Sequence, residues 1–299
     1  MARQALGRES ATTGGGAVAV ADGERLDDPG PARRVVPRRS ARQRRARHRV
    51  AVWAGRIGLA VFLLALWELG SGHLFDSLIM SRPSAIAEVF GRWLADGTIV
   101  RHGLVTLQVA VIGFVIASAM ALVLGLVLGR SKLFGAILDP YISTLYSLPR
   151  LALVPLLIMW FGIGLQFKVV LVVILVFFLM FSSVYAGVRD VDQNLINAAR
   201  VMGAGRLGVY RHVILPSTLV WIAAGLKVSI PYALAGAVVS EILAANQGLG
   251  YLVSQQAAQF RAAGMFAALI TILVVSYVAN LASESITRRA LRWQGDGQR

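Results

Sequence analysis

Long apolar runs alternate with short charged segments along most of the chain. A helix needs about 20 apolar residues to cross about 30 Å of hydrocarbon, because it rises about 1.5 Å per residue. Six runs reach this length, and they predict an all-α, polytopic membrane protein with six transmembrane helices. The expected spans are residues 51–70, 103–128, 140–162, 166–188, 215–243 and 263–286.

Composition supports a membrane protein and removes several other classes. Hydrophobic residues make up 57% of the chain and charged residues only 15%, with a mean hydropathy of +0.66. The net charge is +15, and in a membrane protein the location of the basic residues along the chain indicates its orientation in the bilayer. We therefore expect no nucleic-acid partner. The absence of cysteine excludes disulfides, thiolate metal sites and cysteine nucleophiles.

The first fifty residues form a separate region that is rich in arginine between positions 33 and 49. This region holds too few apolar residues to build a core, so we expect a disordered tail over residues 1–50. The apolar run that follows is too long for a signal peptide and is expected to remain as the first span. The arginines would keep the tail in the cytoplasm against anionic lipid, or alternatively bind a partner.

Basic residues near the span ends predict the topology, because cytoplasmic loops carry an excess of lysine and arginine. With six alternating spans, Arg130, Arg189 and Arg288 fall on the same side as the amino-terminal arginines. The opposite side has a weaker basic bias. Both termini are therefore expected in the cytoplasm, with a six-helix domain at 51–287 and a basic carboxy-terminal tail at 288–299.

The segment 189–215, between the fourth and fifth spans, is much longer than most helix connections. Asp190 and Asp192 are typical of a helix start, and Gly203 is typical of a helix end. Pro216, a residue favoured in a first helical turn, would open the fifth span. We therefore expect a short helix on the cytoplasmic face, with an apolar side that lipid or another protein must cover.

The same segment resembles the EAA loop of ATP-binding cassette (ABC) importer permeases. That loop has the pattern Glu-Ala-Ala, three residues, Gly, nine residues, Ile-x-Leu-Pro, and the spacing here matches throughout. Two residue types differ, since Asn197 replaces the usual glutamate and Val213 the usual isoleucine. The matching positions are Asn197, Ala198, Ala199, Gly203, Val213, Leu215 and Pro216.

Further segments are similar to the nitrate, sulfonate and taurine branch of these permeases. They are LPRLALVPL at 148–156, WFGIG at 160–164 and GLGY at 248–251. Their order along a chain of six spans makes the resemblance extend over about residues 53–293. It implies the fold of a type I ABC importer permease in the cell membrane of a prokaryote.

The resemblance also implies partners and a mechanism. Such a chain would be half of a dimeric pore, with a second permease subunit that is expected to be identical. Two separate ATPase subunits would use ATP, and an extracytoplasmic solute-binding protein would deliver an anion such as an alkanesulfonate, taurine or nitrate. The chain has no G-x-x-x-x-G-K-[ST] phosphate loop, so we expect it to bind no cofactor and to be a transport subunit rather than an enzyme.

By the same resemblance, the short cytoplasmic helix would be a coupling helix that docks in a groove of the ATPase. Gly203 would let the ATPase surface approach, and Pro216 would fix the angle of the fifth span. Asn197 removes a carboxylate, so coupling would depend on shape and apolar contact more than on charge at that position. The alternative is an ordinary amphipathic segment at the membrane interface.

Polar residues and prolines inside the spans are candidates for the translocation pathway, because an unpaired charge in hydrocarbon is costly. Lys227 would offer a positive charge to an anion, or alternatively reach the interface or pair with another span. Ser240 and Glu241 would form a gate or a binding-protein contact, or Glu241 would be a plain interfacial carboxylate. Pro149 and Pro155 would each free a helix carbonyl near the pathway.

Two rival classes remain open at this stage. A secondary transporter driven by an ion gradient would also have many spans, but it would be expected to carry central acids and an internal repeat. An intramembrane enzyme would need a nucleophile with a base, or a metal cluster, and we expect neither catalytic nor metal-binding residues. Gly125 and Gly129 predict tight packing of the second span, either within the subunit or at a dimer seam.

Overall fold

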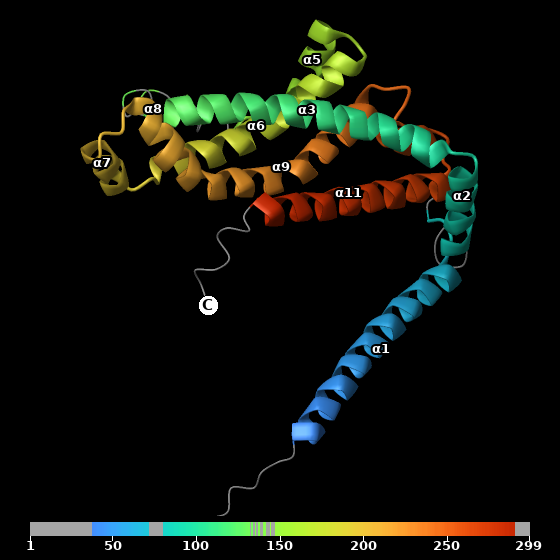
Figure 1. Ribbon diagram of the computed structural model, residues 1–299. Coiled ribbons are helices and arrows are strands. Elements are labelled where there is room, and N and C mark those ends of the chain that lie inside the picture. Colours follow the sequence, from blue (N-terminus) through green and yellow to red (C-terminus); the bar gives the residue numbers. More distant parts are fainter. Residues whose placement is uncertain are drawn as a thin grey trace, which may run out of the picture. The chain divides into compact units, whose positions relative to one another are not determined.

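The computed structural model describes residues 38–71, 80–131, 133, 135, 137, 140, 141, 144 and 147–290. The chain divides into two compact units, residues 1–58 and 59–299. The described helices of the second unit are drawn in Figure 1, where all of them except α10 are labelled. They are α2 (Pro83–Ala95), α3 (Thr98–Gly129), α5 (Val154–Phe161), α6 (Leu165–Arg189), α7 (Gln193–Val201), α8 (Arg206–Val209), α9 (Leu215–Leu243), α10 (Leu249–Ala258) and α11 (Ala262–Ala290).

Helix α1 (Arg38–Gly70) begins within the arginine-rich region that the sequence predicted to be a tail. Arginine has a good helix propensity, so nothing in these residues opposes a helix that continues beyond the apolar run. Within the first unit, the Arg56 guanidinium lies 5.4 Å from the centre of the Trp53 ring. Residues 1–37 and 291–299 of the predicted tails lie outside the described residues.

Five helices among the described residues are long and apolar enough to cross a membrane. They match the predicted spans except for the third, at 140–162. There the helix is interrupted at Leu148 and Pro149, and a short 3-10 turn (Arg150–Leu153) leads into α5. The third span is thus wrong as one uninterrupted helix, because proline disfavours helix at the residue before it. Part of this segment lies outside the described residues, so the count of six remains a prediction.

Helix α6 packs along both α3 and α9, and small residues make the approach close (Figure 1). A Cβ atom added to Gly125 would lie 2.8 Å from Val184 Cγ1, and one added to Gly129 would lie 2.8 Å from Val188 Cβ. The predicted tight packing of the second span is confirmed as packing within the subunit. The small residues of α3 recur at every fourth position: Gly113, Ala117, Ala121, Gly125 and Gly129.

The order of these contacts gives the direction of the three helices. Gly113 faces Val172 and Gly129 faces Val188, so α3 and α6 run in the same direction. Gly187 faces Trp221, near the start of α9, whereas Gly236 faces Leu175, so α9 runs in the opposite direction. The start of α3, the start of α6 and the end of α9 therefore lie at one end of this three-helix core.

Gly125→Leu is expected to destabilise the protein, because the added side chain must enter space that Val184 occupies. Overpacking of this kind typically costs about 1–3 kcal/mol. Gly103→Leu is the matched control, since it lies on the same helix and an added Cβ meets nothing within 4 Å. Thermal unfolding of the two detergent-purified variants checks this, and equal midpoints for both would contradict the packing described.

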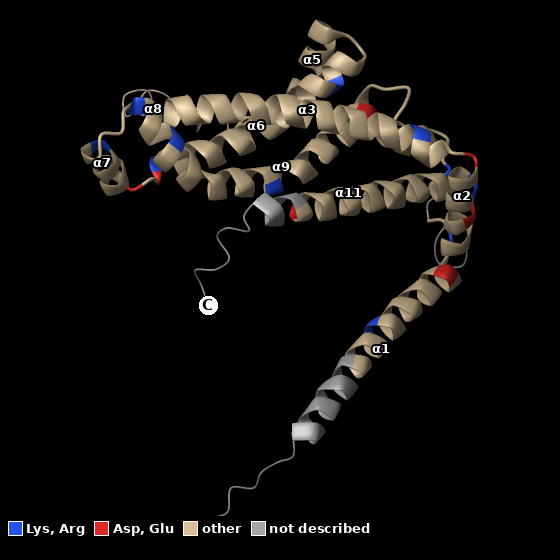
Figure 2. Ribbon diagram, in the orientation of Figure 1, with Lys and Arg blue, Asp and Glu red and all other residues tan. Residues whose placement is uncertain are grey.

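The two ends of the core carry different elements. Helices α7 and α8 lie at the end where α3 finishes, and α2 and α10 lie at the end where α3 begins (Figure 1). Charged residues lie mostly toward these ends, with long uncharged stretches between them (Figure 2). This distribution is what burial of the middle of each helix in hydrocarbon requires.

Candidate functional site

Helix α7 is short and has a defined start and end. The Asp192 side chain accepts a hydrogen bond from the Asn194 amide at 2.8 Å, which caps the amino terminus. At the other end, Gly203 takes a left-handed conformation with φ of +86°. The Gly203 and Ala204 amides then donate to the carbonyls of Arg200 and Ala199, the bonding pattern of a Schellman motif. The predicted start and end of this helix are confirmed.

The apolar residues of this segment divide between a buried and an exposed side. Ile196 and Ala199 are buried in a cluster with Val188 and Ile214 at the end of the three-helix core. Other apolar side chains of the segment are largely in solvent. Val201 is 89% exposed, Met202 81% and Leu207 82%. We call these last three side chains the apolar surface of the α7–α8 segment.

The chain enters the fifth span earlier than the sequence predicted. Helix α8 passes into a π-helical turn, η2 (Tyr210–Ile214), and then directly into α9, so the apolar helix begins at Arg206. Pro216 lies in the first turn of α9 but does not open the span. The π turn widens the helix by one residue per turn and is a feature often found at functional sites.

The predicted coupling residues occupy different environments within this segment. Asn197 and Ala198 are exposed, and Ala199 is buried beneath them. Gly203 is exposed at the helix end. The remaining three lie along the path into α9: Val213 and Pro216 are half-buried, and Leu215 is 41% exposed.

Asn197→Glu is expected to leave transport nearly unchanged. Asn197 is exposed, and its Oδ1 accepts only a long hydrogen bond, 3.4 Å, from Gln193 Nε2 on the same helix. A carboxylate there disturbs no buried contact. Uptake by the assembled transporter checks this, and a large gain with Asn197→Glu, absent from Asn197→Gln, would mean that coupling depends on a charge at this position.

The opposite end of the core holds a buried carboxylate, Glu241, near the end of α9. Its side chain is fully buried. Oε2 accepts hydrogen bonds from Thr106 Oγ1 at 2.8 Å and from the Gly250 amide at 3.0 Å. Within the described residues, Oε1 has no hydrogen-bond partner. The interpretation of Glu241 as a plain interfacial carboxylate is wrong, because tertiary packing has removed it from solvent.

The turn that follows α9 is held by side chains from three helices. Gly248 N donates to His102 Nδ1 at 3.0 Å, and Leu249 N donates to Thr106 Oγ1 at 2.8 Å. Lys168 Nζ donates to the Gln247 carbonyl at 3.4 Å. The bond to His102 requires an unprotonated Nδ1. We call His102, Thr106, Lys168, Glu241 and the turn 247–250 the Glu241 cluster.

Glycines make this arrangement sterically possible. A Cβ atom added to Gly248 would overlap the Glu241 carboxylate, and one added to Gly250 would overlap the Val238 carbonyl. Gly248 also has φ of +118°, which side chains rarely adopt. The GLGY segment that the sequence singled out thus brings three consecutive backbone amides, those of residues 248–250, to polar side chains of α3 and α9.

The other candidate pathway residues are dispersed. Lys227 is exposed partway along α9, whereas Ser240 is fully buried and its hydroxyl donates to the Ala237 carbonyl at 2.6 Å. Pro149 is exposed before the 3-10 turn. Pro155 lies in the first turn of α5, where its missing amide would have no helical partner, so it frees no carbonyl. The expectation that Pro155 frees a helix carbonyl is wrong for this reason.

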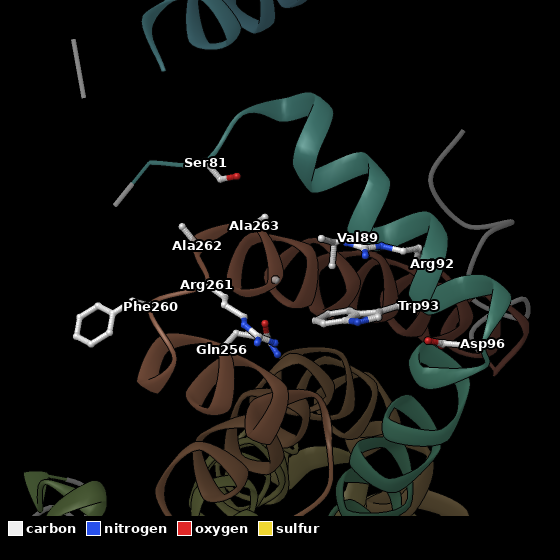
Figure 3. A pocket seen from close by; sticks show the side chains of 11 residues that line it. Ser81, Val89, Arg92, Trp93, Asp96, Gln256, Phe260, Arg261, Ala262 and Ala263 are labelled. Atoms are coloured by element: carbon white, nitrogen blue, oxygen red, sulfur yellow. The ribbon is translucent and has the colours of Figure 1, made fainter. Parts of the chain in front are cut away.

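A hollow of about 460 Å³ lies between α2 and the turn from α10 to α11. Figure 3 shows Trp93 of α2 beside Arg261 and Gln256, with Asp96 on the other side of Trp93. Hydrogen bonds from the Thr98 hydroxyl and amide hold the pKa of Asp96 below its usual value. Phe260 at the rim is 77% exposed and points away from the hollow (Figure 3).

Three polar residues of the Glu241 cluster were not predicted from the sequence. They are Lys168, His102 and Thr106, and the available signal was polar residues near the ends of apolar runs. In the part of the chain that the structure describes, no three histidine, aspartate or glutamate side chains are grouped as a metal site would need. The structure instead has exposed apolar side chains at one end of the core and buried polar groups at the other.

These features define a class of protein. The described residues form a helical protein with five apolar helices long enough to span a membrane, a short helix at one end of the core and buried ionisable groups at the other. Residues 113–292 match the family model for the binding-protein-dependent transport system inner membrane component. The chain therefore belongs to this family, the permease subunits of ABC importers.

Named relatives support the same assignment. The chain is 31% identical over 246 residues to the taurine transport system permease protein TauC of Escherichia coli K12, covering 80% of this chain and 89% of the relative. It is 29% identical over 244 residues to the putative aliphatic sulfonates transport permease protein SsuC of Bacillus subtilis 168, covering 81% and 88%. The predicted family and its sulfonate and taurine branch are confirmed.

Solved structures support the fold. An inward-facing structure of the MetNI methionine ABC transporter superimposes with a TM-score of 0.53 at 22% identity. It covers 66% of this chain and 96% of the matched chain. The likeness confirms the predicted all-α importer permease fold.

Proposed function

We propose that the chain forms, with a second identical permease subunit, the translocation pathway of an ABC importer for a small anion. Alkanesulfonates, taurine and nitrate are the candidate solutes, and relatives named for taurine and aliphatic sulfonates support the first two. An extracytoplasmic binding protein delivers the solute. Two separate ATPase subunits supply the energy, since this chain carries no phosphate loop of its own.

The observation that carries the proposal is the apolar surface of the α7–α8 segment. Val201, Met202 and Leu207 are more than four-fifths exposed, although Ile196 of the same segment is anchored in the core. Exposed apolar patches on an ordered surface mark interaction sites. In the proposed topology this surface faces the cytoplasm, where an ATPase is available to cover it.

The predicted topology belongs to this proposal. Both termini lie in the cytoplasm, with tails at 1–50 and 288–299 and a six-span permease domain at 51–287. Arg130, Arg200 and Arg206 line one hollow beside α8, which supports a cytoplasmic position for this end of the core. The Glu241 cluster then faces the outside, together with α2 and the turn from α10 to α11.

The coupling residues transmit movement rather than perform chemistry. Docking of the ATPase on α7 shifts Ile196 and Ala199, which pack with Val188 of α6 and with Ile214 of η2, the turn that leads into α9. Both spans then move relative to α3, and access alternates between the two sides. Lys227 is exposed on α9, which supports a position facing the pathway or the second subunit. The proposal also assigns Ser240, Glu241, Pro149 and Pro155 to the outer part of the pathway.

Copurification tests the proposal directly. A tagged permease expressed with its candidate ATPase and binding protein is expected to retain the ATPase in detergent. A thermal-shift screen of the binding protein then identifies the solute by the increase in its melting temperature. Failure of the ATPase to copurify, together with uptake driven by a proton gradient, would support the ion-gradient-driven secondary transporter instead.

A further inference from the structure

A cavity of about 560 Å³ opens beside the Glu241 cluster, where α6 begins and α9 ends. Three amide side chains, Gln108, Asn246 and Gln247, lie along it with Lys168. Apolar side chains, including Ile163 and Leu243, form another part of its lining. The cavity thus combines polar and apolar surfaces, as sites for small organic ligands do.

Lys168 is the cation of this cavity. Its residue is only 6% exposed, and within the described residues Nζ makes one hydrogen bond, the 3.4 Å bond to the Gln247 carbonyl. An ammonium group has three N–H donors, so two remain for a ligand. A buried ammonium group with a single hydrogen bond is energetically costly unless a partner supplies the missing hydrogen-bond acceptors.

The start of α6 adds to the positive field in the cavity. Gly164 occupies the N-cap position and has no side chain to cap the first amides of this 25-residue helix. Gly164 and Leu165 both line the cavity. The first turn of a helix carries partial positive charge and unpaired amides, which favour an anion.

Glu241, the acid whose charge acts on Lys168, makes its hydrogen bonds outside this cavity. Glu241 does not line this cavity, and its Oε2 atom is occupied by Thr106 and the Gly250 amide. Its carboxylate lies against Gly248, whose added Cβ would overlap it. Glu241 therefore compensates part of the Lys168 charge, but its carboxylate lies against the turn 247–250 and does not occupy the cavity.

We propose that this cavity binds the anionic head group of a small solute through Lys168, with a short alkyl chain against Ile163 and Leu243. The proposal rests on the proposed function, which makes the solute a small anion, and it assigns the outer binding subsite of that solute. Its recognition chemistry is a charge-assisted hydrogen bond to an oxyanion plus apolar contact.

Site-directed labelling tests the subsite, because the chain has no cysteine of its own. Asn246→Cys places one thiol on the cavity wall of the complete transporter in nanodiscs, and its reaction with a maleimide is followed. Methanesulfonate at millimolar concentration is expected to slow labelling several-fold, in the nucleotide-free or the ATP-analogue-bound state. Dimethyl sulfone, a neutral molecule of similar shape, is expected to give no protection.

Variants of Lys168 identify the cation. Lys168→Gln in the same background is expected to raise the half-protecting methanesulfonate concentration about tenfold or more, the effect of losing a charge-assisted hydrogen bond. Lys168→Arg should keep most of the protection. Arg101→Gln, which removes an exposed cation beside His102, is the matched control and should leave protection unchanged.

The possible outcomes are distinguishable. If the unmodified Lys168 background shows equal labelling with methanesulfonate and dimethyl sulfone in both nucleotide states, the subsite is overturned, whether or not Lys168→Gln folds. If sulfonate uptake continues while that protection is absent, only the subsite fails. If the assembled transporter accumulates no anion, the proposed function itself fails.

Discussion

The double substitution Val201→Asp and Met202→Asp is expected to abolish ATP-driven uptake while the permease stays folded and inserted. Both side chains are more than four-fifths exposed in the isolated chain, so the substitution breaks no internal packing. In the docked complex, two carboxylates would be removed from water without partners. That cost is several kcal/mol, enough to prevent docking.

The measurement is recovery of the ATPase with the tagged permease, followed by uptake in proteoliposomes. Val201→Ile with Met202→Leu is the matched control, because it keeps an apolar surface of similar size and should retain both activities. Normal recovery of the ATPase by the aspartate variant would show that docking occurs elsewhere on the chain.

Gly250→Ala is expected to have the second largest effect. The added Cβ would overlap the Val238 carbonyl and lie 2.8 Å from Glu241 Cβ, so it meets the main chain of α9 rather than a flexible side chain. Helix α10 must then move away, and the hydrogen bond from the Gly250 amide to Glu241 is lost. We expect a loss of about 1–3 kcal/mol or more in stability, and reduced uptake.

Thermal unfolding of the purified variant checks this expectation. Gly91→Ala on α2, where an added Cβ meets nothing within 4 Å, is the control for a glycine replacement in a helix. If the Gly250→Ala and Gly91→Ala proteins have the same melting temperature, α10 is not held against α9 as described.

Local features of the fold were predictable from the sequence, and α7 is the clearest case. Asp192 and Gly203 determine where this helix starts and ends through bonds to neighbouring residues, so their pattern alone was sufficient. Which apolar residues face the core was not predictable, because Ile196 is buried only through its packing with Val188 of α6 and Ile214 of η2, whereas Val201 lacks such packing.

The Glu241 cluster shows the other limit of prediction. Glu241 and its partner Thr106 are 135 positions apart in the chain, and Gly248 and His102 are 146 apart. No periodicity or short motif records such a pairing, so the carboxylate was interpreted from its own position near a helix end. Pro149 was predicted to free a helix carbonyl, but a complete break of the helix there was not predicted, because apolar composition marks a span without marking where its helix ends.

Whether the chain is an ABC importer permease for anions is tested by uptake of a labelled sulfonate into proteoliposomes that contain the permease, its ATPase and its binding protein. We predict accumulation that requires ATP, both partners and the apolar surface of the α7–α8 segment, and that is insensitive to a proton ionophore. Accumulation by the permease alone, driven by an ion gradient and abolished by the ionophore, would contradict it.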